Sequence, residues 1–134
     1  MTDDAKRLLF DALKDMMSPY AAQLQVVVDQ PDNFHLDTHH IMKNGKPLYF
    51  GSVRIGKRYV SYHLMPVYVT PALLDDLSAP LKKRMQGKSC FNFVAHDAQL
   101  FDELATLTAA GFQSYVDAGY IEPAELEQAL RCVL

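Results

Sequence analysis

The chain of 134 residues has no tryptophan, only two cysteines, and no hydrophobic run long enough to cross a bilayer. Two cysteines are too few for a disulfide framework, so we expect Cys90 and Cys132 to be free thiols, with a single bridge between them as the alternative. The first residues, MTDDAKRLLF, lack the basic-then-apolar order of a signal peptide. These absences predict a cytoplasmic protein without a membrane partner.

Motifs that specify a reaction or a nucleotide are also missing. Lysine follows glycine in three expected turns, but none of the three pairs completes a phosphate-binding loop. The pairs are Gly45–Lys46, Gly56–Lys57 and Gly87–Lys88. Ser61 lies near His63, yet no strained Gly-x-Ser-x-Gly turn surrounds it. The sequence therefore favours a binding module over an enzyme.

The composition is that of an ordinary folded domain. Apolar residues make up 49% of the chain and charged residues 22%, which is too apolar for a disordered protein. A chain of this length can bury a substantial core. With no linker or repeat in view, we expect residues 1–134 to form a single domain.

Strand-forming residues concentrate in the middle of the chain. β-branched and aromatic residues with period-two spacing predict three antiparallel strands at 34–42, 47–54 and 58–66. Asn44-Gly45 is the strongest hairpin signal, because both residues tolerate a positive φ. Shorter strands are expected at 25–29 and 89–94.

Helix signals flank these strands. A first helix should run to about Met17 from a cap at Asp3, Asp4 or Thr2, and Asp97 should cap the longest helix, at 97–118. Short helices are expected after Thr70 and Ser78, and a last one at 123–131. The pattern predicts an α+β fold, with a curved antiparallel sheet of four to five strands and helices packed on one face.

The charge is unevenly distributed along the chain. The stretch from Lys43 to Lys88 holds nine basic and two acidic residues, a charge of +7, whereas the remainder carries −10. A basic middle predicts an anion-binding sheet edge, with internal charge complementarity as the alternative. The residues proposed for this site are Arg54, Lys57, Lys88, Tyr62 and His63. We expect Arg54, Lys57 and Lys88 to converge in space.

The partner expected at this site is a small anion or an acidic protein. The sequence pI of about 5.9 disfavours nucleic acid, although tyrosines lie near the basic residues. A homodimer is left open.

Two further constellations could carry chemistry. One face of an expected strand carries His35, Asp37 and His39, which could ligate iron or zinc. The alternative is that these three residues simply form a polar strand face. No other cofactor is expected. Cys90 and His63 are the one plausible nucleophile–base pair, although a cysteine on a strand is usually buried and inert.

The run GKPLYFGSVRIGKRYVSYHLMP, followed by leucine-containing short helices and then by GKSCFNF, resembles the YdhG-like superfamily over about residues 5–118. The resemblance implies a small α+β protein of a domain of unknown function. Proteins of that superfamily often have a tryptophan-containing segment before the first hairpin. This chain has no tryptophan, and residues Gln30 to Phe34 occupy the corresponding position.

Some relatives in that superfamily look like frataxin-type iron chaperones, which use acidic surfaces. By resemblance, the equivalent surface here would be Asp3, Asp4, Asp11 and Asp15. A metal-handling protein of iron-chaperone type is therefore the second functional hypothesis, and an enzyme of unknown reaction is the third.

Overall fold

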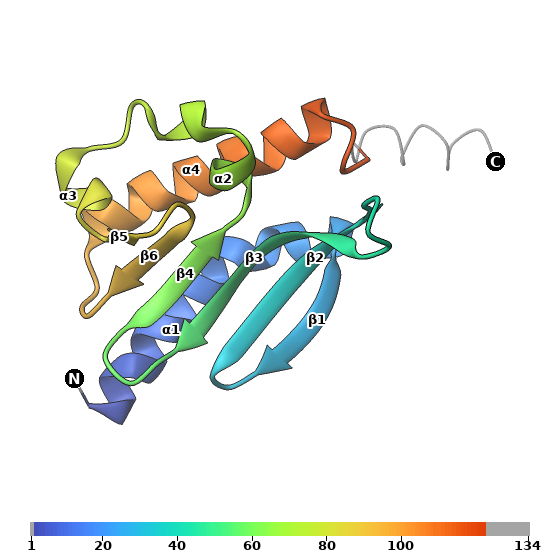
Figure 1. The fold of residues 1–134 in the computed structure, drawn as a ribbon. Coiled ribbons are helices and arrows are strands. Elements are labelled where there is room, and N and C mark those ends of the chain that lie inside the picture. The colour runs from blue at the N-terminus through green and yellow to red at the C-terminus, as the bar shows by residue number, and fades with distance from the viewer. Residues whose placement is uncertain (1, 123–134) are drawn as a thin grey trace.

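The computed structural model describes residues 2–122, so the helix expected at 123–131 and Cys132 lie outside the described residues. The helices are α1 (Asp3–Met17), the 3₁₀ helix η1 (Ser18–Gln23), α2 (Pro66–Val69), the 3₁₀ helix η2 (Pro71–Leu74), α3 (Ala79–Lys82) and α4 (Ala98–Asp117). The strands are β1 (Gln25–Gln30), β2 (Asn33–Ile41), β3 (Pro47–Ile55), β4 (Val60–Leu64), β5 (Met85–Gln86) and β6 (Cys90–Phe93). Figure 1 shows their arrangement.

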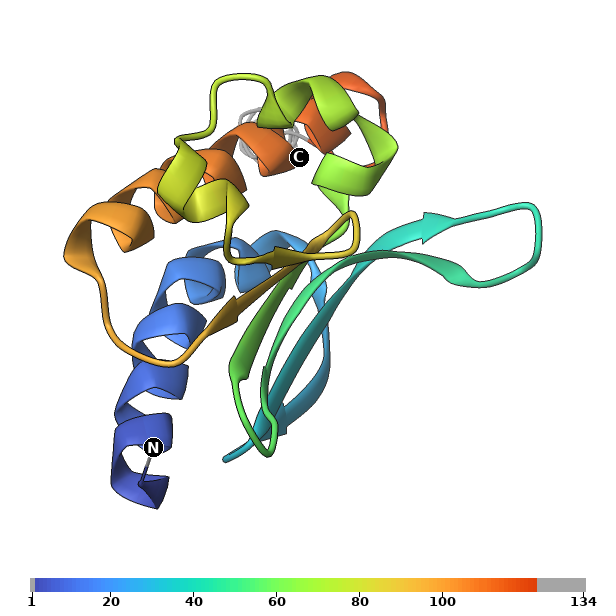
Figure 2. The same cartoon turned by 60° about the vertical axis from the view of Figure 1, so that its left-hand side comes forward.

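The fold is α+β, with an antiparallel open sheet of six strands in the order β1-β2-β3-β4-β6-β5. The helices lie on one side of the curved sheet, as Figure 2 shows for α1 and α4. The predicted number of four to five strands is wrong, because the sheet also contains the short edge strand β5. Its two residues, Met85 and Gln86, are too few to show a period-two pattern.

The core lies between the helices and the inner face of the sheet. Cross-strand pairing sets Phe34, Val53, Tyr62 and Phe91 in one row across β2, β3, β4 and β6, and all four are buried. Side chains directly opposite each other in neighbouring strands share a face, so this row presents a continuous apolar surface. The helix residues that complete the core include Leu13 and Met17 of α1 and Leu104 of α4.

Tyr62 illustrates how the inner face is fixed. Its hydroxyl lies 2.7 Å from Thr108 Oγ1 of α4, and the Thr108 hydroxyl donates to the Leu104 carbonyl. Because the single Thr108 proton is used there, the Tyr62 hydroxyl must be the donor to Thr108. The two buried polar groups are therefore satisfied, and β4 is tied to α4.

Glycine allows two close approaches that bring the layers together. A Cβ built on Gly51 of β3 would lie 2.7 Å from both the Met17 methyl carbon and the His63 carbonyl oxygen. A Cβ on Gly111 would lie 3.0 Å from Pro66 Cβ. The end of α1 can pack directly on β3 only because Gly51 has no side chain.

The helix starts follow the expected capping chemistry. Thr2 caps α1 by accepting from Ala5 N at 3.1 Å, and Asp97 caps α4 by accepting from Leu100 N at 3.1 Å.

The strand expected at 58–66 is shorter, because Pro66 begins α2 and cannot donate to the ladder. Within residues 2–122, no helix is long and apolar enough to cross a membrane.

Candidate functional site

The sheet surface opposite the helices is polar along four neighbouring strands. Pairing places His35, Ser52, His63 and Cys90 in one cross-strand row. A second row holds Arg54, Ser61 and Asn92, and Asp37 pairs with Tyr49 beyond the first row. We call this surface the open face; its residues are His35, Asp37, Tyr49, Ser52, Arg54, Ser61, His63, Cys90 and Asn92.

Asn92 anchors the β6 side of the open face. Its amide oxygen accepts from the Ser61 hydroxyl at 2.7 Å and from the Cys90 thiol at 3.4 Å. Its amide nitrogen donates to Gln86 Oε1 at 2.6 Å. An asparagine amide has two N–H donors, so among residues 2–122 one has no partner and is available for a ligand. The three contacts fix the direction in which that donor points.

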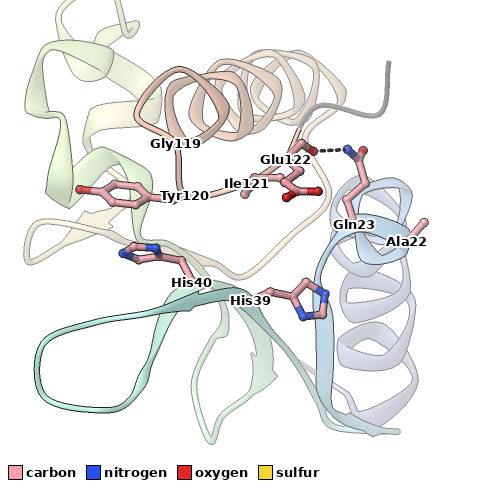
Figure 3. Close-up of a pocket in the computed structure, with 8 residues that line it drawn as sticks. All are labelled: Ala22, Gln23, His39, His40, Gly119, Tyr120, Ile121 and Glu122. Atoms are coloured by element: carbon pink, nitrogen blue, oxygen red, sulfur yellow. Dashed lines mark hydrogen bonds between the residues drawn. The ribbon is translucent and has the colours of Figure 1, made fainter. Parts of the chain in front are cut away.

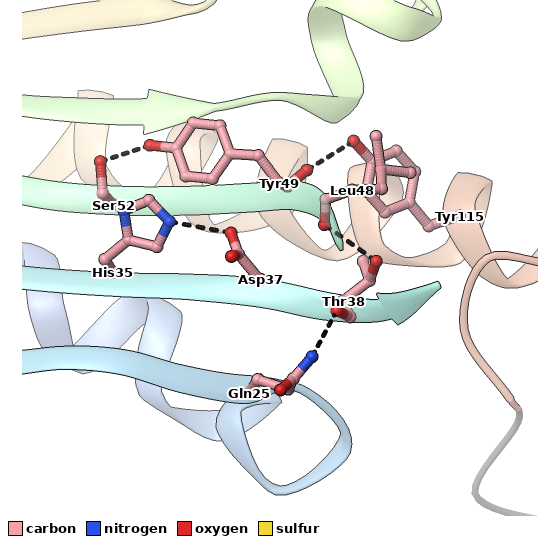
Figure 4. A network of polar contacts seen from close by, with 8 residues as sticks. All are labelled: Gln25, His35, Asp37, Thr38, Leu48, Tyr49, Ser52 and Tyr115. Atoms are coloured by element: carbon pink, nitrogen blue, oxygen red, sulfur yellow. Dashed lines mark hydrogen bonds and ion pairs between the residues drawn. The ribbon is translucent and has the colours of Figure 1, made fainter. Parts of the chain in front are cut away.

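Tyr49 anchors the β2 side of the open face (Figure 4). Its ring stacks on His35 with centroids 4.7 Å apart, and His35 Nε2 lies 2.8 Å from Asp37 Oδ1. The Tyr49 hydroxyl hydrogen-bonds Ser52, while its carbonyl accepts from the Tyr115 hydroxyl of α4 at 2.9 Å. Burial raises the pKa of Tyr49 to about 12, so the phenol stays neutral at physiological pH.

Arg54 supplies the positive charge of the open face, and His63 lies beside it. Burial lowers the pKa of His63, and the nearby positive charge of Arg54 lowers it further. Arg54 is exposed, and within residues 2–122 no carboxylate lies within ion-pair distance of its guanidinium. The open face thus holds a cation that is unpaired within the described part of the chain, beside a half-buried imidazole that is neutral at pH 7.

The structure does not bring the five predicted anion-binding residues together. Tyr62 and His63 are adjacent in β4, so they point to opposite faces, and Tyr62 is in the core. Lys57 lies in the β3–β4 turn and Lys88 in the β5–β6 turn, at opposite ends of β4. The strand alone spans roughly 13 Å at about 3.3 Å per residue.

The two lysines also have different surroundings. The Lys57 carbonyl accepts from Lys6 Nζ at 2.8 Å, which adds a second cation at that turn. Lys88 Nζ lies 5.8 Å from the centre of the Tyr68 ring of α2. The predicted convergence of Arg54, Lys57 and Lys88 is therefore corrected: of the five, Arg54 and His63 belong to the open face.

The predicted metal ligands are only partly together. His35 and Asp37 contact each other directly, but the β2–β3 register shifts between Asp37 and Ile41, and His39 lines a separate hollow with Gln23. Across the described part of the chain, no group of three His, Cys, Asp or Glu side chains could hold a metal ion. That finding covers the acidic residues of α1 named from the iron-chaperone resemblance as well.

Cys90 and His63, the predicted nucleophile and base, are direct cross-strand partners on the open face. However, the thiol of Cys90 donates to Asn92, and burial raises its pKa. The lowered pKa of His63 also disfavours an imidazolium that could stabilise a thiolate. Both side chains are therefore neutral at pH 7, and the pair is a poor nucleophilic centre.

The sequence does not predict Asn92, Ser52 and Tyr49 as site residues. The alternation Cys90-Phe91-Asn92-Phe93 is a usable signal for Asn92, because it separates a polar from an apolar face.

No protein-family model matches the chain, and neither does any curated protein or solved structure. The geometry of the open face is therefore the basis for a functional proposal.

Proposed function

We propose that this protein is a non-enzymatic binding module that takes a small anion, or an acidic group of a partner, on the open face. Arg54 supplies the charge, and His63 and Asn92 supply neutral donors beside it. The observation that carries the proposal is the Arg54 guanidinium, which has no carboxylate partner among residues 2–122, next to a half-buried His63 and polar side chains held by hydrogen bonds. The proposal does not rest on the YdhG-like resemblance, which stays a prediction.

The chemistry of Arg54 suits this role. A guanidinium presents several N–H donors in a planar fork that matches a carboxylate or an oxyanion. Ser61, directly opposite Arg54, uses its proton on Asn92, so its oxygen supplies no donor to an anion. The donors facing an anion are then those of Arg54, one N–H of His63 and the free N–H of Asn92.

Anion binding should strengthen as the pH falls. In the free protein the pKa of His63 lies below its usual value of 6.5, and a bound anion raises that pKa because it favours the charged imidazole. Protonation then places a second positive charge beside Arg54. We expect sulfate, whose own charge is constant in this range, to bind several-fold more tightly at about pH 5.5 than at about pH 7.5.

NMR titration of the full chain with sodium sulfate at both pH values measures this effect, with His63→Gln as the variant. The variant should bind sulfate with the same affinity at both pH values. A pH dependence that persists in His63→Gln would contradict the assigned role of His63. Absence of saturable sulfate binding to the unmodified protein at both pH values would contradict the proposed function itself.

A further inference from the structure

A second candidate site lies away from the open face, at the tip of the β2–β3 hairpin. A cavity of about 490 Å³, open to solvent, lies between that tip, α2 and Tyr120, which follows α4. Its apolar walls are Met42, Leu48 and Val69. None of the open-face residues lines it, so it is separate from the proposed anion site.

Two aromatic rings, those of His40 and Tyr120, line both this cavity and a neighbouring one. The His40 and Tyr120 rings are 4.8 Å apart, and beyond them lies a second, more polar hollow of about 410 Å³ that includes His39 and Gln23. Figure 3 shows His40 and Tyr120 facing each other across the space between the hairpin and the residues after α4. The ring pair therefore divides an apolar compartment from a polar one.

Three hydrogen bonds shape the hairpin tip. Met42 N donates to the Lys46 carbonyl at 2.9 Å, Gly45 N donates to the Met42 carbonyl at 2.9 Å, and Lys46 N donates to Asn44 Oδ1 at 2.9 Å. Two apolar side chains that line the cavity are nevertheless exposed to water: Met42 of the tip is 44% exposed, and Val69 of α2 is 43% exposed. An apolar hollow of this kind is typical of small-molecule sites.

Charge narrows the class of ligand. Lys43 lies at the rim, and no aspartate or glutamate lines this cavity within residues 2–122. In the same described part of the chain, no carboxylate lies within ion-pair distance of Lys43. An unpaired cation beside an apolar hollow fits a flat apolar body that carries one negative charge.

We propose that this cavity binds an aromatic organic anion, such as an aromatic carboxylate. The ring system packs against Met42, Leu48 and Val69, next to the His40–Tyr120 pair, and the carboxylate pairs with Lys43. The cavity volume of about 490 Å³ lies within the range of roughly 300–1,000 Å³ that is usual for small-molecule sites. A ligand of two fused rings is small enough for such a site.

Naphthalene-2-carboxylate and its neutral analogue naphthalene-2-carboxamide are the probes, in NMR titrations of the full chain. We expect saturable shifts at the lining residues. Val69→Glu should weaken carboxylate binding roughly tenfold, because it sets a like charge in the apolar wall. Lys43→Gln should weaken carboxylate binding about threefold and leave carboxamide binding unchanged. Val27→Glu and Lys57→Gln make the same changes elsewhere on the surface and should have no effect.

Three results would overturn the proposal. One is unchanged affinity in Val69→Glu, and another is equal affinity for the carboxamide and the carboxylate. The third is tighter probe binding in Leu130→Glu, which would assign the cavity to residues 123–134 of the chain itself. Arg54→Gln should leave unchanged the naphthalene-2-carboxylate affinity that the cavity-lining residues report, so failure of the open-face proposal and failure of this one are distinguishable.

Discussion

Replacing Gly51 with alanine is expected to lower the free energy of unfolding by about 3 kcal/mol. The new Cβ would lie 2.7 Å from the His63 carbonyl oxygen, which is backbone, and 2.7 Å from the Met17 methyl carbon. Met17 can change rotamer, but the β4 backbone can move only by disturbing its pairing with β3. Chemical denaturation of both proteins, followed by circular dichroism, measures the difference.

Gly45→Ala is the matched control for this substitution. Gly45 has a φ of +81° at the hairpin tip, and a Cβ there would meet nothing within 4 Å. Its cost should be only the left-handed backbone penalty, roughly 1–2 kcal/mol. If Gly51→Ala is no more destabilising than Gly45→Ala, the close packing of α1 on β3 is not as described.

Reversing the charge of Arg54 with Arg54→Glu should abolish measurable sulfate binding, a loss of at least about tenfold in affinity. The fold should be little affected, because Arg54 is exposed and makes no ion pair within residues 2–122. The pKa of His63 should rise, since the cation that lowers it is replaced by an anion. Titration of the His63 ring signals reads out this rise in the absence of any ligand.

Arg58→Glu makes the same change in net charge at an exposed position in the β3–β4 turn. It should leave both the His63 pKa and sulfate binding close to those of the unmodified protein. Equal losses of sulfate affinity in the two variants would mean that sulfate responds to overall charge, and the open face would then have no specific role.

The higher pKa of His63 in Arg54→Glu also changes how stability depends on pH. In the unmodified protein the folded state resists protonation of His63, so its stability falls as the pH drops below about 6.5, where the unfolded chain takes up the proton. Above that pH, His63 is neutral in both states and contributes no pH dependence. The acid-side loss of stability should therefore be smaller in Arg54→Glu.

Local patterns in the sequence predict most of the fold. Asn44-Gly45 marks the β2–β3 turn, where Gly45 has the expected positive φ. Asp97 caps α4 as predicted, and the alternation of Cys90 to Phe93 identifies the buried side of β6. These features depend on neighbouring residues alone, which is why no tertiary information is needed to recognise them.

Features that depend on strand register are not predictable in this way. Strict alternation would place Tyr49, Gly51 and Val53 on one face of β3. The register shifts between Leu36 and Asp37, and this irregularity turns Tyr49 to the open face while Gly51 stays against α1. The same limit explains the failed convergence of Lys57 and Lys88, since both occupy turns and only the strand order shows that the turns lie at opposite ends of β4.

The most direct test of the open face as an anion site is the location of sulfate-induced NMR shifts on the 134-residue chain. The account predicts saturable shifts centred on Arg54, Ser61, His63 and Asn92, which come from three strands and meet only on that face. Shifts confined to the turns at Lys57 and Lys88, or spread over all basic residues without saturation, would contradict it.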